Sequence, residues 1–156
     1  SKKKVTSLAD MKGLKIRTSG DYQIKAVSRL GMTPVAMDLG ETVSAVQTGV
    51  VDGIIMSYGI VGSFGLAPFL KYAYELPFFV ATGMWVVNKD VCNKISPRDQ
   101  RIIEISAMQA GLRYSYSEDL IADIRREQFR GRGMEIVKPS EAELISATKA
   151  TQPVWG

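Results

Sequence analysis

The first third of the chain alternates between short apolar segments and amphipathic ones. Residues 14–17 alternate apolar and polar side chains, the period of a half-buried strand, and 34–37 and 50–56 are further strand candidates. Between them, helices are predicted over about residues 22–30 and 42–48, each followed by a glycine. This order predicts two right-handed crossovers and therefore an α/β fold, with a mainly parallel sheet flanked by helices.

The middle of the chain predicts strands followed by one long helical segment. Residues 78–82 and 84–88 are strand segments of the buried type. Ser96 is a candidate N-cap before a proline, and the helical pattern continues over 99–130, long for a single domain. This segment forms either one helix or two helices that meet near Gly111.

The remaining segments are a glycine-rich connector and a short C-terminal unit. The glycines of residues 59–68 do not have the spacing of a dinucleotide-binding loop, so the segment is predicted to be a flexible or closely packed connector. Residues 134–137 predict a strand. Ser140 and Glu143 have the spacing of a capping box, which predicts a last helix.

Composition excludes several classes of chemistry. The chain has 156 residues, 46% of them hydrophobic, which is enough for a substantial core, and it contains no histidine. Serine–histidine and cysteine–histidine catalysis and imidazole metal sites are therefore excluded. A single cysteine, Cys92, excludes an internal disulfide framework and is expected to be a small buried hydrophobe. No metal site and no cofactor are predicted.

The net charge of +4 is compatible with a small anionic ligand and does not require nucleic acid. The arginines of residues 125–132 alternate with acidic residues and predict a charged helix face, so no nucleic-acid partner is expected. No apolar run is long enough for a membrane span. The basic residues 2–4 lack a following apolar segment, so this chain shows no signal peptide; a trimmed secreted protein would look the same.

Arg17 is the main candidate for ligand binding. It lies at the carboxyl end of the first predicted strand, before a polar turn and a helix start, where ligands bind in open α/β sheets. A guanidinium there can bind a carboxylate through two parallel hydrogen bonds. The alternative is a surface arginine that pairs with Asp21 or is solvated.

Other candidates have ordinary structural alternatives. Met37, Met56 and Tyr58 lie near predicted strand ends and could line a pocket, although core packing explains each of them separately. Asp52 could act as a general base, but capping a turn or forming a local ion pair is the simpler interpretation. From the residues alone, the chain is an α/β domain with a candidate anion site and no set of catalytic groups.

Three segments resemble one known family. Residues 10–17 read D-M-K-G-L-K-I-R, 31–37 read G-M-T-P-V-A-M, and 41–53 read E-T-V-S-A-V-Q-T-G-V-V-D-G. The chain resembles the solute-binding proteins of tripartite ATP-independent periplasmic (TRAP) transporters, of the C4-dicarboxylate-binding (DctP-like) type. Their segments typically read D-L-K-G-L-K-I-R, G-A-x-P-V-x-M and E-V-Y-x-A-L-Q-T-G-V-V-D-G.

The resemblance implies a periplasmic-binding-protein-like fold of two lobes that close on a ligand. Residues 1–80 would then form most of the second lobe. Residues 81–156 would supply strands, the long helix and segments that return to the other lobe. An N-terminal lobe block would precede Ser1 and a tail would follow Gly156, so the resemblance implies a fragment.

The resemblance also implies roles for individual residues. Arg17 matches the family arginine that binds the ligand carboxylate, and Leu39 falls where a hydrophobic or aromatic residue contacts the ligand. Met56 falls where many members have the asparagine of D-G-x-E-N-P, but residues 52–57 read D-G-I-I-M-S here. The glutamate and asparagine are both missing, which disfavours a sugar acid or a small dicarboxylate bound at both ends.

With the candidate ligand-binding residues Arg17, Leu39, Met56, Tyr58 and Met37, we expect a monocarboxylate with an apolar or aromatic body. The resemblance implies a periplasmic protein that captures an organic acid, delivers it to the TRAP membrane permease and catalyses no reaction. Two alternatives are a small α/β enzyme that uses carboxylates such as Asp52 or Glu41, and an interaction module that dimerises through the surface left by the missing lobe.

Overall fold

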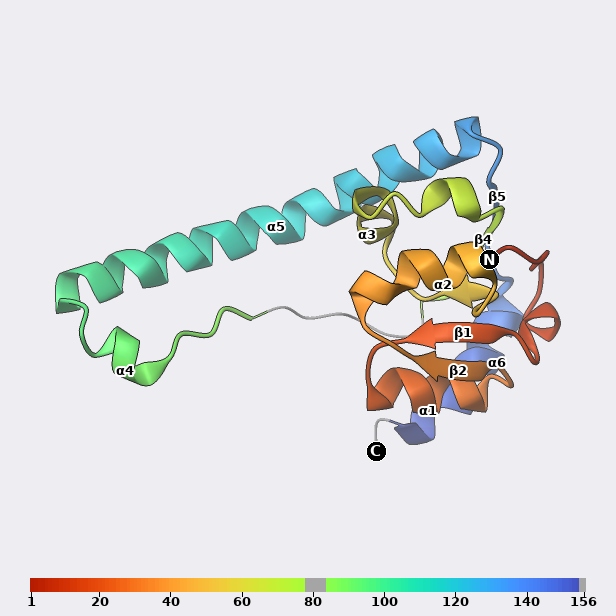
Figure 1. Cartoon of the computed structure of the whole chain (residues 1–156), viewed down its shortest axis with the longest axis horizontal. Helices are drawn as coiled ribbons and strands as arrows, with labels where there is room; N and C mark the ends of the chain where they lie inside the picture. The colour runs from red at the N-terminus through yellow and green to blue at the C-terminus, as the bar shows by residue number, and fades with distance from the viewer. Residues whose placement is uncertain (78–83, 155–156) are drawn as a thin grey trace.

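The computed structural model describes residues 1–77 and 84–154. It consists of an α/β body and a long arm that projects from it (Figure 1). The body holds the strands and most of the helices. The arm is formed by the first part of one long helix together with residues 84–96, which lead to the start of that helix at the tip of the arm.

The sheet that was expected from the first third of the chain is present and parallel. Strand β1 (Lys15–Thr18) lies between β2 (Thr33–Ala36) and β3 (Gly53–Ile54), and both neighbours pair with it in parallel. The crossovers contain α1 (Asp21–Arg29) and α2 (Thr42–Thr48). The prediction of a mainly parallel α/β unit is confirmed, although β3 is shorter than the segment predicted at 50–56.

A second, two-stranded parallel sheet joins distant parts of the chain. Strand β4 (Tyr72–Tyr74) pairs with β5 (Glu135–Val137), which confirms the strand predicted at 134–137. Helix α6 (Glu141–Thr151) begins at the predicted capping box, in which Ser140 is the N-cap. Among the described residues, short 3-10 helices lie at Ala9–Met11, Leu39–Glu41, Ala67–Phe69 and Gln152–Val154.

Two apolar clusters hold the body together. The larger cluster contains residues of α2, α3 and the end of the long helix, with Val46, Leu66 and Phe129 at 2% exposure or less. The smaller cluster lies around β1 and includes Ile16 and Val27. Burial of such side chains contributes about 1.5–3 kcal/mol each, so these clusters are the main source of stability.

Helix α5 (Pro97–Gly131) is a single helix that continues through Gly111 without interruption. Its C-terminal part packs against α3 (Tyr58–Ser63). A Cβ added at Gly62 would lie 2.6 Å from Nε of Arg125, and one at Gly59 would lie 3.5 Å from Ile121. The glycine-rich connector is therefore a closely packed one, in which the missing side chains allow α5 to approach.

The strand predicted at 84–88 is wrong. These residues form no strand, and Met84, Trp85 and Val86 are 82%, 77% and 81% exposed. Their apolar character fits a buried strand, but no described strand lies beside them to pair with their backbone. The companion prediction at 78–82 lies outside the described residues.

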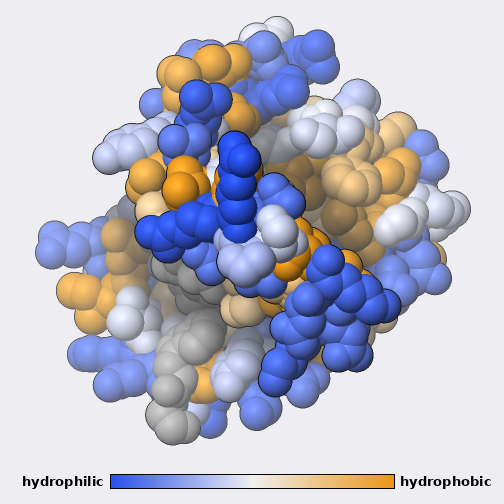
Figure 2. Space-filling model, turned by 90° about the vertical axis from the view of Figure 1, so that its left-hand side faces the viewer, coloured by the Kyte–Doolittle hydropathy of each residue, from blue (hydrophilic) through white to orange (hydrophobic). Residues whose placement is uncertain are grey.

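The rest of the arm is equally unburied. Helix α4 (Lys89–Cys92) follows the exposed segment, and Cys92 is half-buried, not fully buried as expected. Several apolar side chains of α5 are exposed, including Met108 at 69% and Tyr116 at 82%. Figure 2 views the molecule from the tip of the arm and shows hydrophobic side chains at the surface among charged ones. Within residues 1–77 and 84–154, no helix is both long and apolar enough to cross a membrane.

Candidate functional site

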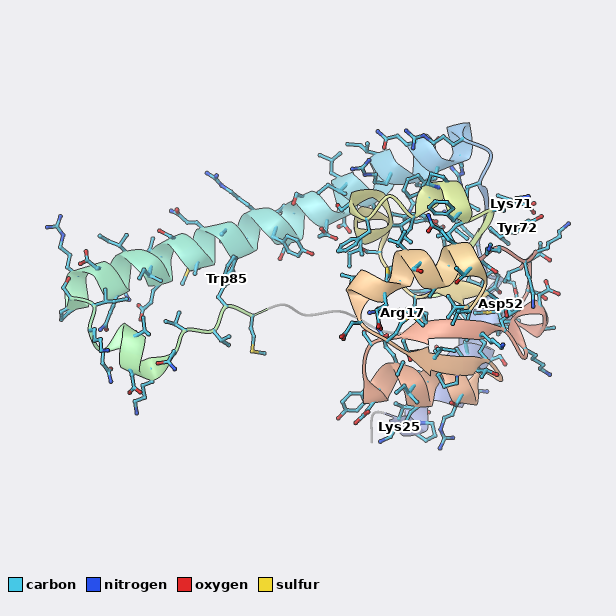
Figure 3. All side chains as sticks on the ribbon, in the orientation of Figure 1. Arg17, Lys25, Asp52, Lys71, Tyr72 and Trp85 are labelled. Carbon is cyan, nitrogen blue, oxygen red and sulfur yellow. The ribbon has the colours of Figure 1, made fainter. Side chains whose placement is uncertain are left out.

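The carboxyl ends of β1, β2 and β3 meet at one edge of the sheet because the three strands are parallel. Arg17 lies on the central strand, opposite Val35 of β2 and Ile54 of β3. Figure 3 shows Arg17 at the edge of the body that faces the arm, whereas Asp52 and Tyr72 lie toward the opposite end of the strands. This edge is where open α/β sheets bind their ligands.

Arg17 is a buried cation that pairs with no anion among residues 1–77 and 84–154. The residue is 5% exposed, and its Nε is buried with no hydrogen-bond partner within the described part of the chain. Arg17 also takes part in none of the ion pairs formed by residues 1–77 and 84–154. The alternative of a solvated surface arginine, or one paired with Asp21, is therefore wrong.

Burial without a partner destabilises the charged form of Arg17. Desolvation lowers the pKa of its guanidinium, and the nearby negative charge of Asp38 partly offsets this shift. Asp38 is the N-cap of a capping box with Glu41, so its carboxylate is held by the start of the helical turn. A buried charge that lacks a close partner is costly, and an anion brought to Arg17 would remove that cost.

The residues after β2 and β3 surround this edge with apolar surface. Met37 and Leu39 follow β2, and the backbone N–H of Met37 donates to the carbonyl of Thr18 at 3.2 Å. Met56 follows β3. All three side chains are half-buried, and Met37 and Met56 pack against the larger apolar cluster. The strands thus bring these predicted residues to the edge that holds Arg17.

Tyr58 is engaged in a network that fixes α5 to the body. Its hydroxyl donates to Glu75 at 2.9 Å, and Nε of Arg126 donates to the same carboxylate oxygen at 2.7 Å. The Arg126 guanidinium also lies 5.4 Å from the centre of the Tyr58 ring. Burial, together with the Glu75 carboxylate, raises the pKa of Tyr58 well above its ordinary value. The Tyr58 hydroxyl is therefore occupied in the described chain, and its contact with a ligand stays a prediction.

The hollow lined by β3 and β4 is not centred on Arg17. Its volume is about 510 Å³, and Met56 and Tyr58 line it together with residues of β3 and β4. Arg17, Met37 and Leu39 are not among its lining residues. The candidates therefore divide between the sheet edge and this hollow.

Asp52 has a local structural role. Its carboxylate accepts from the backbone N–H of Lys15 at 3.0 Å and pairs with Lys3 at 2.9 Å. Partial burial alone would raise the pKa of Asp52, but the Lys15 hydrogen bond and the Lys3 ammonium outweigh it and lower that pKa. The local ion pair expected as the simpler interpretation is confirmed.

Several residues of the site region were not indicated by the sequence. Thr18 is fully buried, and its hydroxyl has no hydrogen-bond partner within the described residues. Glu75 and Arg126 meet although they are 51 positions apart, a contact that no local pattern reveals. Asp38 carries a recognisable helix-start signal, but its proximity to Arg17 depends on the pairing of β1 with β2.

Fold and site together define an α/β lobe with a buried cation, unpaired within the described part of the chain, at the edge of a parallel sheet where ligands bind. The whole chain, residues 1–156, matches the model of the bacterial extracellular solute-binding protein family 7. The chain belongs to this family, which confirms the resemblance found in its motifs. The family consists of solute-binding proteins, so the alternative of a carboxylate enzyme is not supported.

Known relatives agree with this assignment. The chain is 28% identical over 162 residues to the 2,3-diketo-L-gulonate-binding periplasmic protein YiaO of Escherichia coli, covering 97% of this chain and 47% of the relative. A TRAP periplasmic solute-binding protein from Pseudomonas putida, solved with bound D-glucuronate, is 27% identical with a TM-score of 0.84, covering 99% of this chain and 51% of that one. One from Xanthobacter autotrophicus, solved with bound β-D-galacturonate, shares the fold with a TM-score of 0.91 at 21% identity, covering 99% and 51%.

The chain spans about half the length of the curated relatives it matches. Activity, ligand and partners of a whole protein are therefore matters for proposal.

Proposed function

We propose that this chain forms the carboxylate-binding part of a periplasmic solute-binding protein. That protein captures an organic acid and delivers it to a TRAP membrane permease. The observation that carries the proposal is Arg17, which is 5% exposed and has no ion-pair partner in the described chain. Such a charge does not stabilise the fold, because no nearby ion pair offsets the free energy lost when the guanidinium is removed from water. A ligand carboxylate would supply the missing partner.

A carboxylate suits this position for geometric reasons. The planar guanidinium can form two parallel hydrogen bonds with a carboxylate, and such charge-assisted bonds are the strong class. The relatives' greater length supplies the material for a second lobe, and closure of that lobe over the edge would exclude water. Exclusion of water lowers the local dielectric constant and strengthens the pair. Binding and release then require no bond to be made or broken.

We further propose that the ligand is a monocarboxylate with an apolar or aromatic body. Arg17 offers one cation at the edge, and Met37, Leu39 and Met56 provide apolar surface after β2 and β3. YiaO and the Pseudomonas putida protein are named for or solved with sugar acids, whose single carboxylate fits the same cation. Apart from the carboxylate, those ligands are polar. The experiment must therefore test whether the rest of this chain's ligand is polar or apolar.

The decisive experiment is calorimetry on the full-length protein with D-glucuronate and m-hydroxyphenylacetate as the two probes. We expect m-hydroxyphenylacetate to bind more tightly. Arg17→Ala should weaken the binding of the preferred acid by about 2 kcal/mol or more, roughly thirtyfold, because it removes a buried charge-assisted pair. Arg17→Lys should restore only part of the loss.

The matched control is Arg29→Ala, which removes an exposed arginine of the same body and should leave affinity unchanged. Unchanged affinity for Arg17→Ala would contradict the role of this residue. Tighter binding of D-glucuronate would contradict the apolar body while leaving the carboxylate site in place.

Self-association of the 156-residue chain is a second candidate property. It is favoured by the exposed apolar side chains of the arm, among them Trp85, Met108 and Tyr116. Exposed apolar surface of this extent is typical of an interface. Light scattering over a range of concentrations tests it, and a monomer throughout would contradict it.

A further inference from the structure

The segments at the edge that holds Arg17 carry acidic side chains and no basic ones. Residues 19–21, 37–41 and 55–57 directly follow β1, β2 and β3. They contain Asp21, Asp38 and Glu41, and neither lysine nor arginine. All three acidic residues are exposed, whereas Arg17 is buried. The edge therefore combines a buried cation with a rim of carboxylates.

The basic residues nearest in sequence or space are engaged elsewhere. Lys25 lies one turn further along α1, with its Nζ 6.0 Å from the centre of the Tyr22 ring, and Figure 3 shows it apart from Arg17. Arg126 is paired with Glu75. Neither cation is placed to neutralise the carboxylates of the rim.

Asp38 is the rim residue whose charge acts on Arg17. The pairing of β1 with β2 places Thr18 opposite Ala36, and the N–H of Met37 donates to the carbonyl of Thr18 at 3.2 Å. Asp38 is the next residue along, and its negative charge interacts with the Arg17 guanidinium. The two nevertheless form no ion pair in the described part of the chain.

A helix start keeps the Asp38 carboxylate from moving onto the guanidinium. Asp38 and Glu41 form a capping box, in which the Asp38 side chain accepts from the N–H of Glu41. In return, the Glu41 carboxylate accepts from the N–H of Asp38 at 3.3 Å. The hydroxyl of Thr42, which is fully buried, donates to the Asp38 carbonyl at 3.2 Å. Asp38 is thus fixed near Arg17 without neutralising it.

We propose that Asp38 is a specificity-determining residue, whose charge excludes dicarboxylates from the Arg17 site. This inference rests on the proposed function, because it requires that Arg17 binds a ligand carboxylate. A monocarboxylate bound to Arg17 forms a pair without net charge, on which Asp38 has little effect. A dicarboxylate would keep one unpaired negative charge beside Asp38, and like charges repel. Such repulsion of the wrong ligand is a general source of specificity.

Repulsion by Asp38 differs from the mere lack of a second cation. Without a second cation, the second carboxylate of a diacid has no partner, whatever residue occupies position 38. With Asp38 present, repulsion is added, and it grows when closure of a second lobe excludes water and lowers the local dielectric constant. A neutral residue at position 38 therefore separates the two explanations.

The test is calorimetry on the full-length protein with two pairs of probes. D-glucarate differs from D-glucuronate by a second carboxylate, and 3-carboxyphenylacetate carries a carboxylate in place of the hydroxyl of m-hydroxyphenylacetate. Asp38→Asn removes the charge and keeps a preferred N-cap residue of nearly the same shape. Asp38→Ser also keeps a preferred N-cap residue but has a smaller side chain, so agreement between the two variants assigns the effect to charge.

The matched control is Glu135→Gln, which removes the same charge far from the site. Glu135 is exposed and lies opposite Tyr72, toward the other end of the body from Arg17 (Figure 3). In the pair that the protein binds, we expect the diacid to bind at least about tenfold more weakly than the monoacid. Both Asp38 variants should raise the affinity for the diacid, relative to the monoacid, about fivefold or more, and Glu135→Gln should leave that ratio unchanged.

Three results would overturn the role of Asp38. They are an unchanged ratio in both Asp38 variants, an equal change of the ratio in Glu135→Gln, and binding of a diacid by the unchanged protein as tightly as its monoacid. A failure of the proposed function gives a different result, because Arg17→Ala would then leave the affinity for the monoacid unchanged.

Discussion

The body and the arm use similar amino acids with opposite results. In the body, Val27, Val46 and Leu66 are completely buried, and each contacts residues distant in sequence. In the arm, Trp85 and Tyr116 are 77% and 82% exposed. A hydrophobic side chain is therefore not buried because of its own character alone. It is buried only where other parts of the chain pack against it. Three predictions test how far the two regions differ, in order of decreasing effect.

The largest contrast is expected between Phe129→Ala and Tyr116→Ala, both on α5. Phe129 is 2% exposed at the base of the helix, so truncation should destabilise the body by about 3–5 kcal/mol. Tyr116 lies on the arm, and its truncation should change stability by no more than about 0.5 kcal/mol. Urea unfolding of the 156-residue chain gives both values. Similar losses of stability in the two variants would show that the arm is packed in solution. The contrast between a buried body and an exposed arm would then be wrong.

An intermediate effect is expected at the junction between body and arm. Arg126→Met leaves the Glu75 carboxylate with fewer donors and removes the contact with Tyr58, which should cost about 1–3 kcal/mol. The matched change is Arg130→Met, which removes a 2.7 Å pair with Glu127 on the exposed side of the same helix and should cost under about 1 kcal/mol. The difference between the urea midpoints of the two variants measures how much the contacts of Arg126 stabilise the junction between body and arm. Equal midpoints would show that Glu75 does not anchor α5.

The smallest effect is an acid dependence confined to the body. Hydrogen bonds from the backbone N–H and the hydroxyl of Ser140, and from the N–H of Leu8, lower the pKa of Glu143 from 4.5 to about 2. The stabilisation is fully present above pH 4.5, where the Glu143 carboxyl is ionised in both the folded and the unfolded chain. It is lost as pH falls from 4.5 toward 2, because the unfolded chain binds more protons in that range.

Glu143→Gln should therefore lower Tm at pH 7 and reduce the fall of Tm between pH 4.5 and 2. Glu104→Gln, which removes an exposed pair with Arg101 on the arm, is the control and should do neither. If Tm of Glu143→Gln fell between pH 4.5 and 2 as much as that of the unchanged chain, Glu143 would not be the source of the acid dependence.

Local signals sufficed for most of the body. Glycines after helices, the Ser140 capping box and the strand period over 14–17 depend on neighbouring residues, and the structure confirms the elements they predict. The family motifs indicated Arg17, but not that it is buried with no ion-pair partner among the described residues, since burial depends on β2, β3 and the segments after them. The contact of Tyr58 and Arg126 with Glu75 was likewise beyond a local pattern, because it joins α3, β4 and α5.

The error at 84–88 has the opposite cause. Its side chains carry a strong local strand signal, but a strand requires a partner for its backbone, and no described strand lies within reach. The helix of α5 succeeds in the same arm because every helical hydrogen bond is made within the segment.

Helix α5 also has a mechanical consequence. A continuous helix of 35 residues is a rod about 52 Å long, and its contacts with α3 near Gly59 and Gly62 lie toward one end. With a fulcrum at Ile121 and Arg125, about 40 Å of helix extends to Pro97, so a rotation of about 10° displaces that tip by roughly 7 Å. The close glycine contacts and the Tyr58–Glu75–Arg126 bonds therefore set the angle of a lever, and small changes in packing at its short end become large movements at the other.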